Sequence, residues 1–273
     1  MSIDHRRLLL AMFQAAVNAA DPALCVPPHL PPRPVGRTVV VGAGKAAASM
    51  AAAVEAHWDR PLEGLVVTRY GHSRPCKYVE VIEASHPVPD EAGSKAARRI
   101  LDKVSALTAD DLVLVLISGG GSALLALPAQ GLTLAEKQSI NRAMLRCGAN
   151  IAEINVVRKH LSAIKGGRLA VAAAPARVVT LAISDVPGDN LSIIASGPTA
   201  PDPSTRDDAV AVLAKYGIEI PATVAKLLNH EISETPKPGN PCFATVTHRL
   251  VATPQRSLEA AAKESRETPD YLP

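Results

Sequence analysis

Three runs of branched apolar residues, each followed at once by a turn of small or acidic residues, constrain the fold of this chain most. They are TVVV at 38–41, LVLVLI at 112–117 and VVTLAI at 178–183. Near-continuous apolar strands that alternate with helical stretches are typical of a parallel sheet with helices on both faces. The sequence therefore predicts the α/β class, with a doubly wound, mostly parallel sheet in a Rossmann-like three-layer sandwich.

Composition narrows the kind of protein. Aromatic residues are only 3% of the 273 residues, so the core must pack through Ala, Val, Leu and Ile. The formal net charge of +3 is small and dispersed, and it indicates no nucleic-acid partner. No run approaches the roughly 20 apolar residues of a membrane span, and an amphipathic helix is expected over about residues 4–20. The four distant cysteines fit reduced thiols, so we expect a cytoplasmic protein without a membrane partner.

The first strand leads into the turn Gly42-Ala43-Gly44-Lys45 and then an alanine-rich helix. Glycine at Gly42 and Gly44 lets backbone amides approach an anion at a helix N-terminus, and Lys45 adds a positive charge there. The spacing also satisfies the dinucleotide pattern G-x-G-x-x-A, although the second strand ends in Arg69 rather than in an acid. This turn therefore predicts phosphate binding and leaves a dinucleotide open, since Arg69 could meet a 2′-phosphate.

A second glycine turn follows the strand at 112–117. Three glycines in succession before a helix allow several N–H groups to converge on a phosphate, and serine hydroxyls can add donors. No lysine follows at the spacing of a Walker loop. The predicted phosphate- and nucleotide-binding residues of this turn are Ser118, Gly119, Gly120, Gly121 and Ser122.

The third strand is followed by the loop Ser184-Asp185-Val186-Pro187-Gly188-Asp189. Asp185 and Asp189 could hold Mg²⁺, which takes one or two carboxylates beside substrate phosphates, or one could act as a base on a hydroxyl. An ordinary turn with a capping aspartate is the structural alternative. Ser196, in the nearby Ser-Gly-Pro-Thr stretch, is a further candidate at the same edge of the sheet.

A basic cluster surrounds Gly166-Gly167. Arg158, Lys159 and Lys165 could hold a carboxylate or a phosphate, and arginine does so through two parallel hydrogen bonds. The alternative is a solvated helix end on which cations complement the helix dipole. His86, beside a proline, could move a proton but is more typical of a structural residue.

Taken in order, several stretches resemble the glycerate 2-kinase family that carries a C-terminal MOFRL domain. They include VVVGAGKAAASMA, SHPVPDEAG, LISGGGSALLALP, NVVRKHLSAIKGGRLA, ISDVPGD and IASGPTAPDPST, and together they cover most of residues 8–216. The resemblance implies transfer of the ATP γ-phosphoryl group to the 2-hydroxyl of D-glycerate. Members are also labelled hydroxypyruvate reductase, so an NAD(P)-dependent reductase is the alternative enzyme.

The resemblance also implies roles and a domain division. ATP and Mg²⁺ are the implied cofactors, and glycerate is the implied small-molecule substrate. Lys45, Asp185 and Asp189 would be catalytic. The two aspartates would also be the metal ligands. Arg158, Lys159 and Ser196 would bind substrate. Residues 1–235 would form the N-terminal α/β domain and residues 236–273 the start of a connection to a missing domain. We therefore expect the chain to be inactive alone, or to be a nucleotide-binding remnant; a homo-oligomer stays open.

Overall fold

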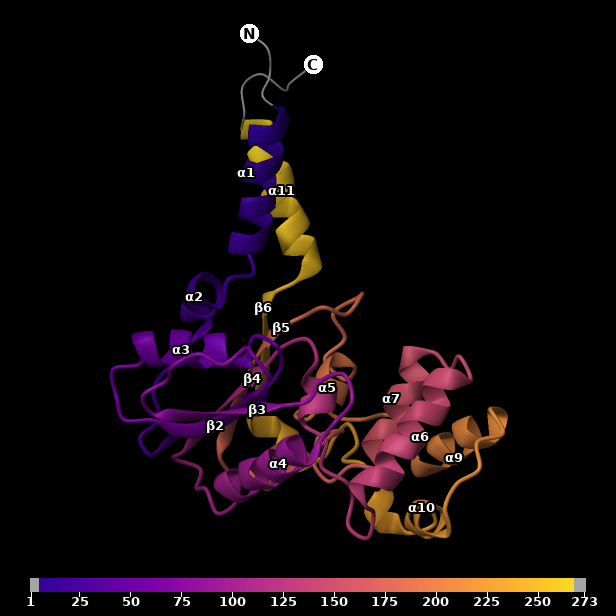
Figure 1. Ribbon diagram of the computed structural model, residues 1–273. Coiled ribbons are helices and arrows are strands. Elements are labelled where there is room, and N and C mark those ends of the chain that lie inside the picture. Colours follow the sequence, from indigo (N-terminus) through magenta and orange to yellow (C-terminus); the bar gives the residue numbers. More distant parts are fainter. Residues whose placement is uncertain (1–4, 268–273) are drawn as a thin grey trace.

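The computed structural model describes residues 5–267, and its centre is a six-stranded parallel sheet in the order β3-β2-β1-β4-β5-β6 (Figure 1). The strands are β1 (Thr38–Ala43), β2 (Glu63–Arg69), β3 (Val79–Ala84), β4 (Leu112–Ile117), β5 (Arg177–Ile183) and β6 (Val246–Ala252). The strand order reverses between the neighbours β1 and β4. In doubly wound sheets, ligands bind outside the carboxyl ends of the strands at such a switch point.

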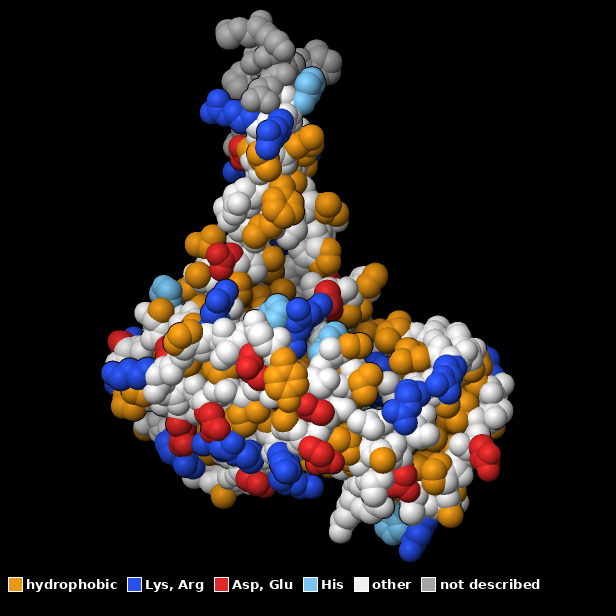
Figure 2. Space-filling view, viewed as in Figure 1, with side chains coloured by type: hydrophobic (Ala, Val, Ile, Leu, Met, Phe, Trp, Pro, Cys, Tyr) orange, Lys and Arg blue, Asp and Glu red, His pale blue; other side chains and the backbone are white. Residues whose placement is uncertain are grey.

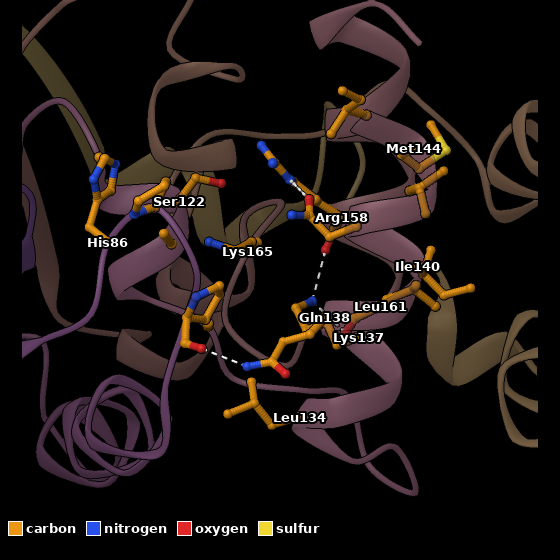
Figure 3. A pocket seen from close by; sticks show the side chains of 18 residues that line it. His86, Ser122, Leu134, Lys137, Gln138, Ile140, Met144, Arg158, Leu161 and Lys165 are labelled. Atoms are coloured by element: carbon orange, nitrogen blue, oxygen red, sulfur yellow. Dashed lines mark hydrogen bonds between the residues drawn. The ribbon is translucent and has the colours of Figure 1, made fainter. Parts of the chain in front are cut away.

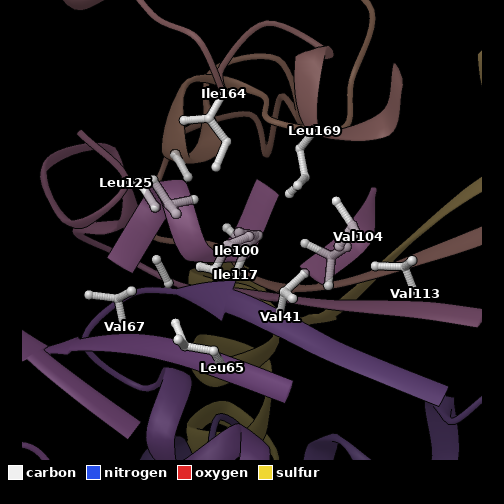
Figure 4. Packing of buried hydrophobic residues seen from close by; sticks show 14 of the residues in the cluster. Val41, Leu65, Val67, Ile100, Val104, Val113, Ile117, Leu125, Ile164 and Leu169 are labelled. Atoms are coloured by element: carbon white, nitrogen blue, oxygen red, sulfur yellow. The ribbon is translucent and has the colours of Figure 1, made fainter. Parts of the chain in front are cut away.

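The described residues form the helices α1 (His5–Asn18), α2 (Pro22–Cys25), α3 (Ala47–His57), α4 (Glu91–Val104), α5 (Gly121–Leu124), α6 (Leu134–Arg146), α7 (Ile151–His160), α8 (Arg168–Ala173), α9 (Arg206–Lys215), α10 (Ala222–Leu228) and α11 (Pro254–Glu267). Helix α3 covers one face of the sheet, and α4, α5 and α8 cover the other, as the apolar strands predict. Alternate residues of β1 enter different cores: Val41 packs with Ile100 of α4 (Figure 4), whereas Val40 packs with Met50 of α3. The predicted fold class is confirmed.

A smaller helical layer lies beside the sheet and has its own core. Helices α6, α7, α9 and α10 bury a separate apolar cluster that includes Met144, Ile154, Leu213 and Val224. Three of these helices begin with a capping box, in which the cap side chain and the third helical residue satisfy each other's backbone amides. The chain between Leu134 and Ala173 is divided into separate helices near glycines with positive φ, among them Gly148 (74°) and Gly167 (84°).

Helices α1 and α11 pack against each other and stand away from the sheet (Figure 1). Their surface carries exposed apolar side chains, visible as orange in Figure 2, including Leu9, Phe13 and Leu258. No single described helix is long and apolar enough to cross a membrane, although the bent pair His5–Asn18 and Pro22–His29 meets the length and composition criterion together.

The segment after residue 235 belongs to the same sheet. Strand β6 pairs in parallel with β5 along its length, and α11 follows it directly. A domain boundary at residue 235 would therefore separate β6 from its neighbour. The start of the first predicted helix, residue 4, and the predicted connection's last residues, 268–273, lie outside the described residues. A second domain after this point stays a prediction.

Candidate active site

The two glycine turns meet at the switch point. Strands β1 and β4 pair up to Ala43 and Ile117, so the turns that follow them lie side by side. The amide of Lys45 donates to the carbonyl of Gly119 at 2.8 Å, and the amide of Ala46 donates to Ser118 Oγ at 3.0 Å. The two turns therefore form one hydrogen-bonded unit.

The backbone amides of the first turn already donate hydrogen bonds within the protein. Besides Lys45 and Ala46, the amide of Gly44 donates to the Val67 carbonyl at 3.0 Å, and that of Ala47 donates to Gly44 at 3.1 Å. Gly42 lies inside β1, where an added Cβ would come within 2.0 Å of the Leu116 carbonyl oxygen. The structure thus places Gly42 and Gly44 in packing roles and presents no spare N–H group from residues 44–47.

The second turn keeps its amides available. Within residues 5–267, the N–H groups of Gly119 and Gly120 have no hydrogen-bond acceptor, while the Gly121 amide closes the turn on the Ser118 carbonyl at 3.2 Å. Gly120 has φ of 86°, in the left-handed region that glycine adopts without a steric penalty. Successive N–H groups at such a turn make a concave anion site. The turn after β4 therefore has amides available for an anion, whereas the turn after β1 has none.

Three ionisable side chains from other loops stand over this turn. Lys45 Nζ lies 3.7 Å from Asp185 Oδ2, and both side chains are about half exposed. A Cβ on Gly119 would come within 2.0 Å of the Asp185 carboxylate, and one on Gly120 within 3.0 Å of the His86 ring. Burial, and then the charges of Lys45 and Arg69, lower the pKa of His86, so its imidazole is held neutral near pH 7.

The acidic loop offers oxygen ligands that suit Mg²⁺. Asp185 is exposed beside the glycine turn, and the buried Oδ1 atom of Asp189 has no hydrogen-bond partner in the described chain. No group of three or more His, Cys, Asp or Glu residues among residues 5–267 could hold a metal by itself. Mg²⁺ needs only one or two carboxylates when phosphate oxygens and water complete its shell. The residues present therefore fit Mg²⁺ bound together with a phosphate.

Ser196 lies behind the glycine turn rather than in an open site. It is fully buried, its hydroxyl donates to Asn155 Oδ1 at 2.7 Å, and it shares a 2.6 Å hydrogen bond with Ser122 Oγ. Both Ala195 and Ser196 have positive φ, 51° and 61°. Such strain in non-glycine residues persists only where the surrounding structure holds it. Ser196 thus positions Ser122 from within the protein.

A cavity of about 160 Å³ opens next to the glycine turn (Figure 3). Gly120 and Ser122 form part of its wall, together with His86 and residues of α6 and α7. Its cationic residues are Lys137, Arg158 and Lys165, and no Asp or Glu lines it. The structure therefore brings Arg158, but only one other member of the predicted basic cluster, to this site.

The two basic neighbours on α7 point to different places. Arg158 lines the cavity, where its Nε donates to Asn141 Oδ1 at 2.7 Å. Lys159 is buried elsewhere and pairs with Asp202 at 3.1 Å. Consecutive residues on a helix are about 100° apart, so only one of the two can face a given site. Lys159 does not line the cavity, and its charge is already paired.

Sequence reasoning missed two cavity residues of α6, Lys137 and Gln138. The pattern held a usable feature: Leu134, Lys137 and Gln138 follow the i, i+3, i+4 spacing of a buried helix face. A lysine on such a face must reach either a partner or a cavity. Lys137 does both, because its Nζ also donates to the Leu161 carbonyl at 2.7 Å.

Comparisons with known proteins show the family of this chain. Residues 8–229 match the family model DUF4147, described as a domain of unknown function. A protein of Agrobacterium vitis named "Putative hydroxypyruvate reductase" is 56% identical over 261 residues, which cover 95% of this chain and 59% of that protein. D-glycerate 2-kinase of Thermotoga maritima is 44% identical over 264 residues, covering 96% of this chain and 62% of that enzyme.

The fold comparison gives the same family. The crystal structure of glycerate kinase from Thermotoga maritima superposes with a TM-score of 0.87 and 42% identity, covering 96% of this chain and 62% of that one. The chain thus spans about three-fifths of the length of these relatives. The chain belongs to the DUF4147 family, the family of the glycerate 2-kinases.

Proposed function

We propose that this chain is the ATP-phosphate-binding part of a glycerate 2-kinase, which transfers the γ-phosphoryl group of ATP to the 2-hydroxyl of D-glycerate. The observation that carries the proposal is the pair of amides at Gly119 and Gly120 that have no acceptor within residues 5–267, beside the Lys45 side chain. The names of the Thermotoga relatives support the same reaction.

In the proposed reaction, the protein contributes mainly position and charge, as phosphoryl transfer requires. The Gly119 and Gly120 amides donate to phosphate oxygens, and Lys45 neutralises charge on the group that moves. One of the two carboxylates, Asp185 or Asp189, would hold Mg²⁺, which would supply further positive charge to the phosphates. The other carboxylate would accept the proton of the attacking hydroxyl.

The alternative enzyme is an NAD(P)-dependent hydroxypyruvate reductase, as the name of the Agrobacterium relative suggests. Dinucleotide binding in a sheet of this order uses the amides after the first strand to hold the pyrophosphate. In this chain those amides are already donated to Val67, Gly119 and Ser118. The geometry therefore favours the kinase.

A thermal-shift series separates the two enzymes and the non-catalytic remnant. The purified chain is titrated with ATP and Mg²⁺, with NADH and with NADPH. The kinase proposal predicts that ATP with Mg²⁺ stabilises the chain and that NADH and NADPH do not. A ligand that binds only the folded state raises the melting temperature. Selective stabilisation by NADH or NADPH would replace the kinase with the reductase. Stabilisation by none of the three would favour the remnant.

A further inference from the structure

The cavity beside the glycine turn is lined by three basic side chains, Lys137, Arg158 and Lys165, and by no acidic one. Lys165 is 1% exposed, and within residues 5–267 the only hydrogen bond of its ammonium group is a 3.5 Å contact from Nζ to the carbonyl of Ala195. Neither Lys137, Arg158 nor Lys165 forms a salt bridge with any Asp or Glu in residues 5–267. Buried charges in proteins are normally paired, since leaving one uncompensated is strongly destabilising. The cavity therefore lacks a negative partner.

The basic side chains of the cavity affect one another's pKa. Burial lowers the pKa of Lys165 well below its ordinary value, and the charges of Lys137 and Arg158 lower it further. Lys137 donates to the carbonyls of Arg158 and Leu161 near the end of α7, so it has a structural role as well. Lys165 has no comparable structural contact and is the cation with the most to gain from a bound anion.

The size of the cavity limits the anion to a small molecule. Its volume of about 160 Å³ is close to that of an engineered cavity that holds benzene. A three-carbon hydroxy acid is of that size, whereas a nucleotide is much larger. Gln138 and Asn141 line the wall and offer amide groups to hydroxyls.

The position of the cavity suits a molecule that receives a phosphoryl group. Gly120 and Ser122 belong both to the glycine turn and to the cavity wall, so a molecule in the cavity lies next to phosphates on the turn. Figure 3 shows Lys165 and Arg158 on the side of the cavity near Ser122. An acid bound there would be adjacent to the transferred group, as in-line transfer requires.

We propose that this cavity is the acid subsite, in which Lys165 and Arg158 bind the carboxylate of a three-carbon hydroxy acid. Lys137 holds the end of α7 and adds charge. This inference rests on the proposed function, because the kinase reaction supplies the reason for an acid beside the phosphate site.

Calorimetric titration of the full chain tests the subsite. D-glycerate is the probe, glycerol is its uncharged counterpart, and ATP with Mg²⁺ is titrated separately. Lys165→Met removes the charge while keeping an apolar chain of similar length, and Lys95→Met changes an exposed lysine of α4 as the control. We expect the wild-type chain to bind D-glycerate and not glycerol. Lys165→Met should weaken D-glycerate about tenfold or more, since a bond between charged groups is lost, and leave ATP unchanged.

Unchanged D-glycerate affinity in Lys165→Met, equal binding of glycerol, or no D-glycerate binding by the wild-type chain would each overturn the subsite. If Lys165→Met does not fold, the D-glycerate affinity of Arg158→Gln tests the same carboxylate contact. The binding of D-glycerate tests the subsite, and the binding of nucleotide tests the proposed kinase function, so failure of one is distinguishable from failure of the other. Loss of D-glycerate binding in Lys165→Met in a chain that binds no nucleotide would support the subsite and contradict the kinase. Nucleotide binding with D-glycerate unaffected would contradict the subsite alone.

Discussion

Ser122 and Ser196 lie 74 residues apart in the sequence, and their hydroxyl oxygens are 2.6 Å apart in the structure. Ser196 in turn donates to Asn155 of α7. One hydrogen-bonded chain therefore links the glycine turn after β4, the strained stretch at Ala195–Ser196 and the helical layer. This link fixes the turn relative to the cavity, although none of its members is charged.

The Ser122–Ser196 link leads to a prediction about stability. Ser196→Ala should lower the free energy of unfolding by about 1–3 kcal/mol, because the buried Asn155 oxygen loses its donor. Ser196→Gly removes the same hydroxyl but suits a φ of 61°, so it should be less destabilising than Ser196→Ala. Urea unfolding measures both, with Ser139→Ala on the exposed face of α6 as the control. Equal stability of Ser196→Ala and the wild-type chain would show that the link contributes nothing.

Two neighbouring glycines should respond differently to alanine. At Gly120 the positive φ and the His86 ring both oppose a side chain, so Gly120→Ala should destabilise the fold by about 1–2 kcal/mol. At Gly119 the new methyl group meets the exposed Asp185 carboxylate, which can move. Gly119→Ala should therefore melt near the wild-type temperature while weakening ATP and Mg²⁺ binding. Thermal unfolding and ATP titration check the pair; a Gly119→Ala variant with wild-type ATP affinity would argue against this turn as the phosphate site.

Lys45 should matter for ligands that carry phosphate. Lys45→Ala removes a charge-assisted contact of about 1.5–3 kcal/mol, so ATP affinity should fall by about tenfold or more. Its ion pair with Asp185 is half exposed, so the variant should lose little stability. Calorimetry compares it with Lys95→Ala. An unchanged affinity would place Lys45 among ordinary surface lysines.

The buried lysine Lys137 should make stability depend on pH. Burial, and then the charges of Arg158 and Arg168, lower its pKa to about 7. Between this value and the ordinary lysine pKa of about 10.4, the unfolded chain holds a proton that the folded chain has lost. Raising the pH through this window therefore favours folding, and below about pH 7 the unfavourable burial is fully present.

Lys137→Met should flatten this dependence. Urea unfolding at about pH 7 and about pH 9 should show a larger gain in stability with pH for the wild-type chain than for the variant. Lys165 remains in both proteins, and since its pKa is also lowered, it adds a slope of the same sign to each. Identical slopes in the two proteins would mean that Lys137 does not titrate in this range.

The fold class was predictable because the residues of each central strand are nearly all apolar, which indicates burial on both faces. Val39, Val40 and Val41 are all buried, and a strand covered on both faces needs no polar alternation. The strand order was not predictable, since the pairing of β1 with β4 depends on contacts across 72 residues, such as the Ala46 amide with Ser118. The three successive glycines of the turn after β4 predict a phosphate site, which stays a prediction. Which turn keeps free amides could not be predicted, because the first turn donates its amides to Val67 and to the second turn.

The acid cavity was the least predictable part. Arg158 and Lys159 are indistinguishable in the sequence, and only the rotation of α7 decides that one faces the cavity and the other Asp202. Lys165 follows the end of that helix, where no periodicity remains to indicate its direction. Lys137 was detectable as a charge on an apolar helix face.

We expect nucleotide phosphates to bind the turn after β4 and not the turn after β1. Selective ¹⁵N labelling of the 17 glycines allows each turn to be followed by its own amide signals. On addition of ATP and Mg²⁺, the Gly119 and Gly120 amide resonances should shift most, because their N–H groups acquire phosphate acceptors. Gly42 and Gly44 should shift less, since the Gly44 amide already donates to Val67. Dominant shifts at Gly44, with Gly119 and Gly120 unmoved, would contradict the account.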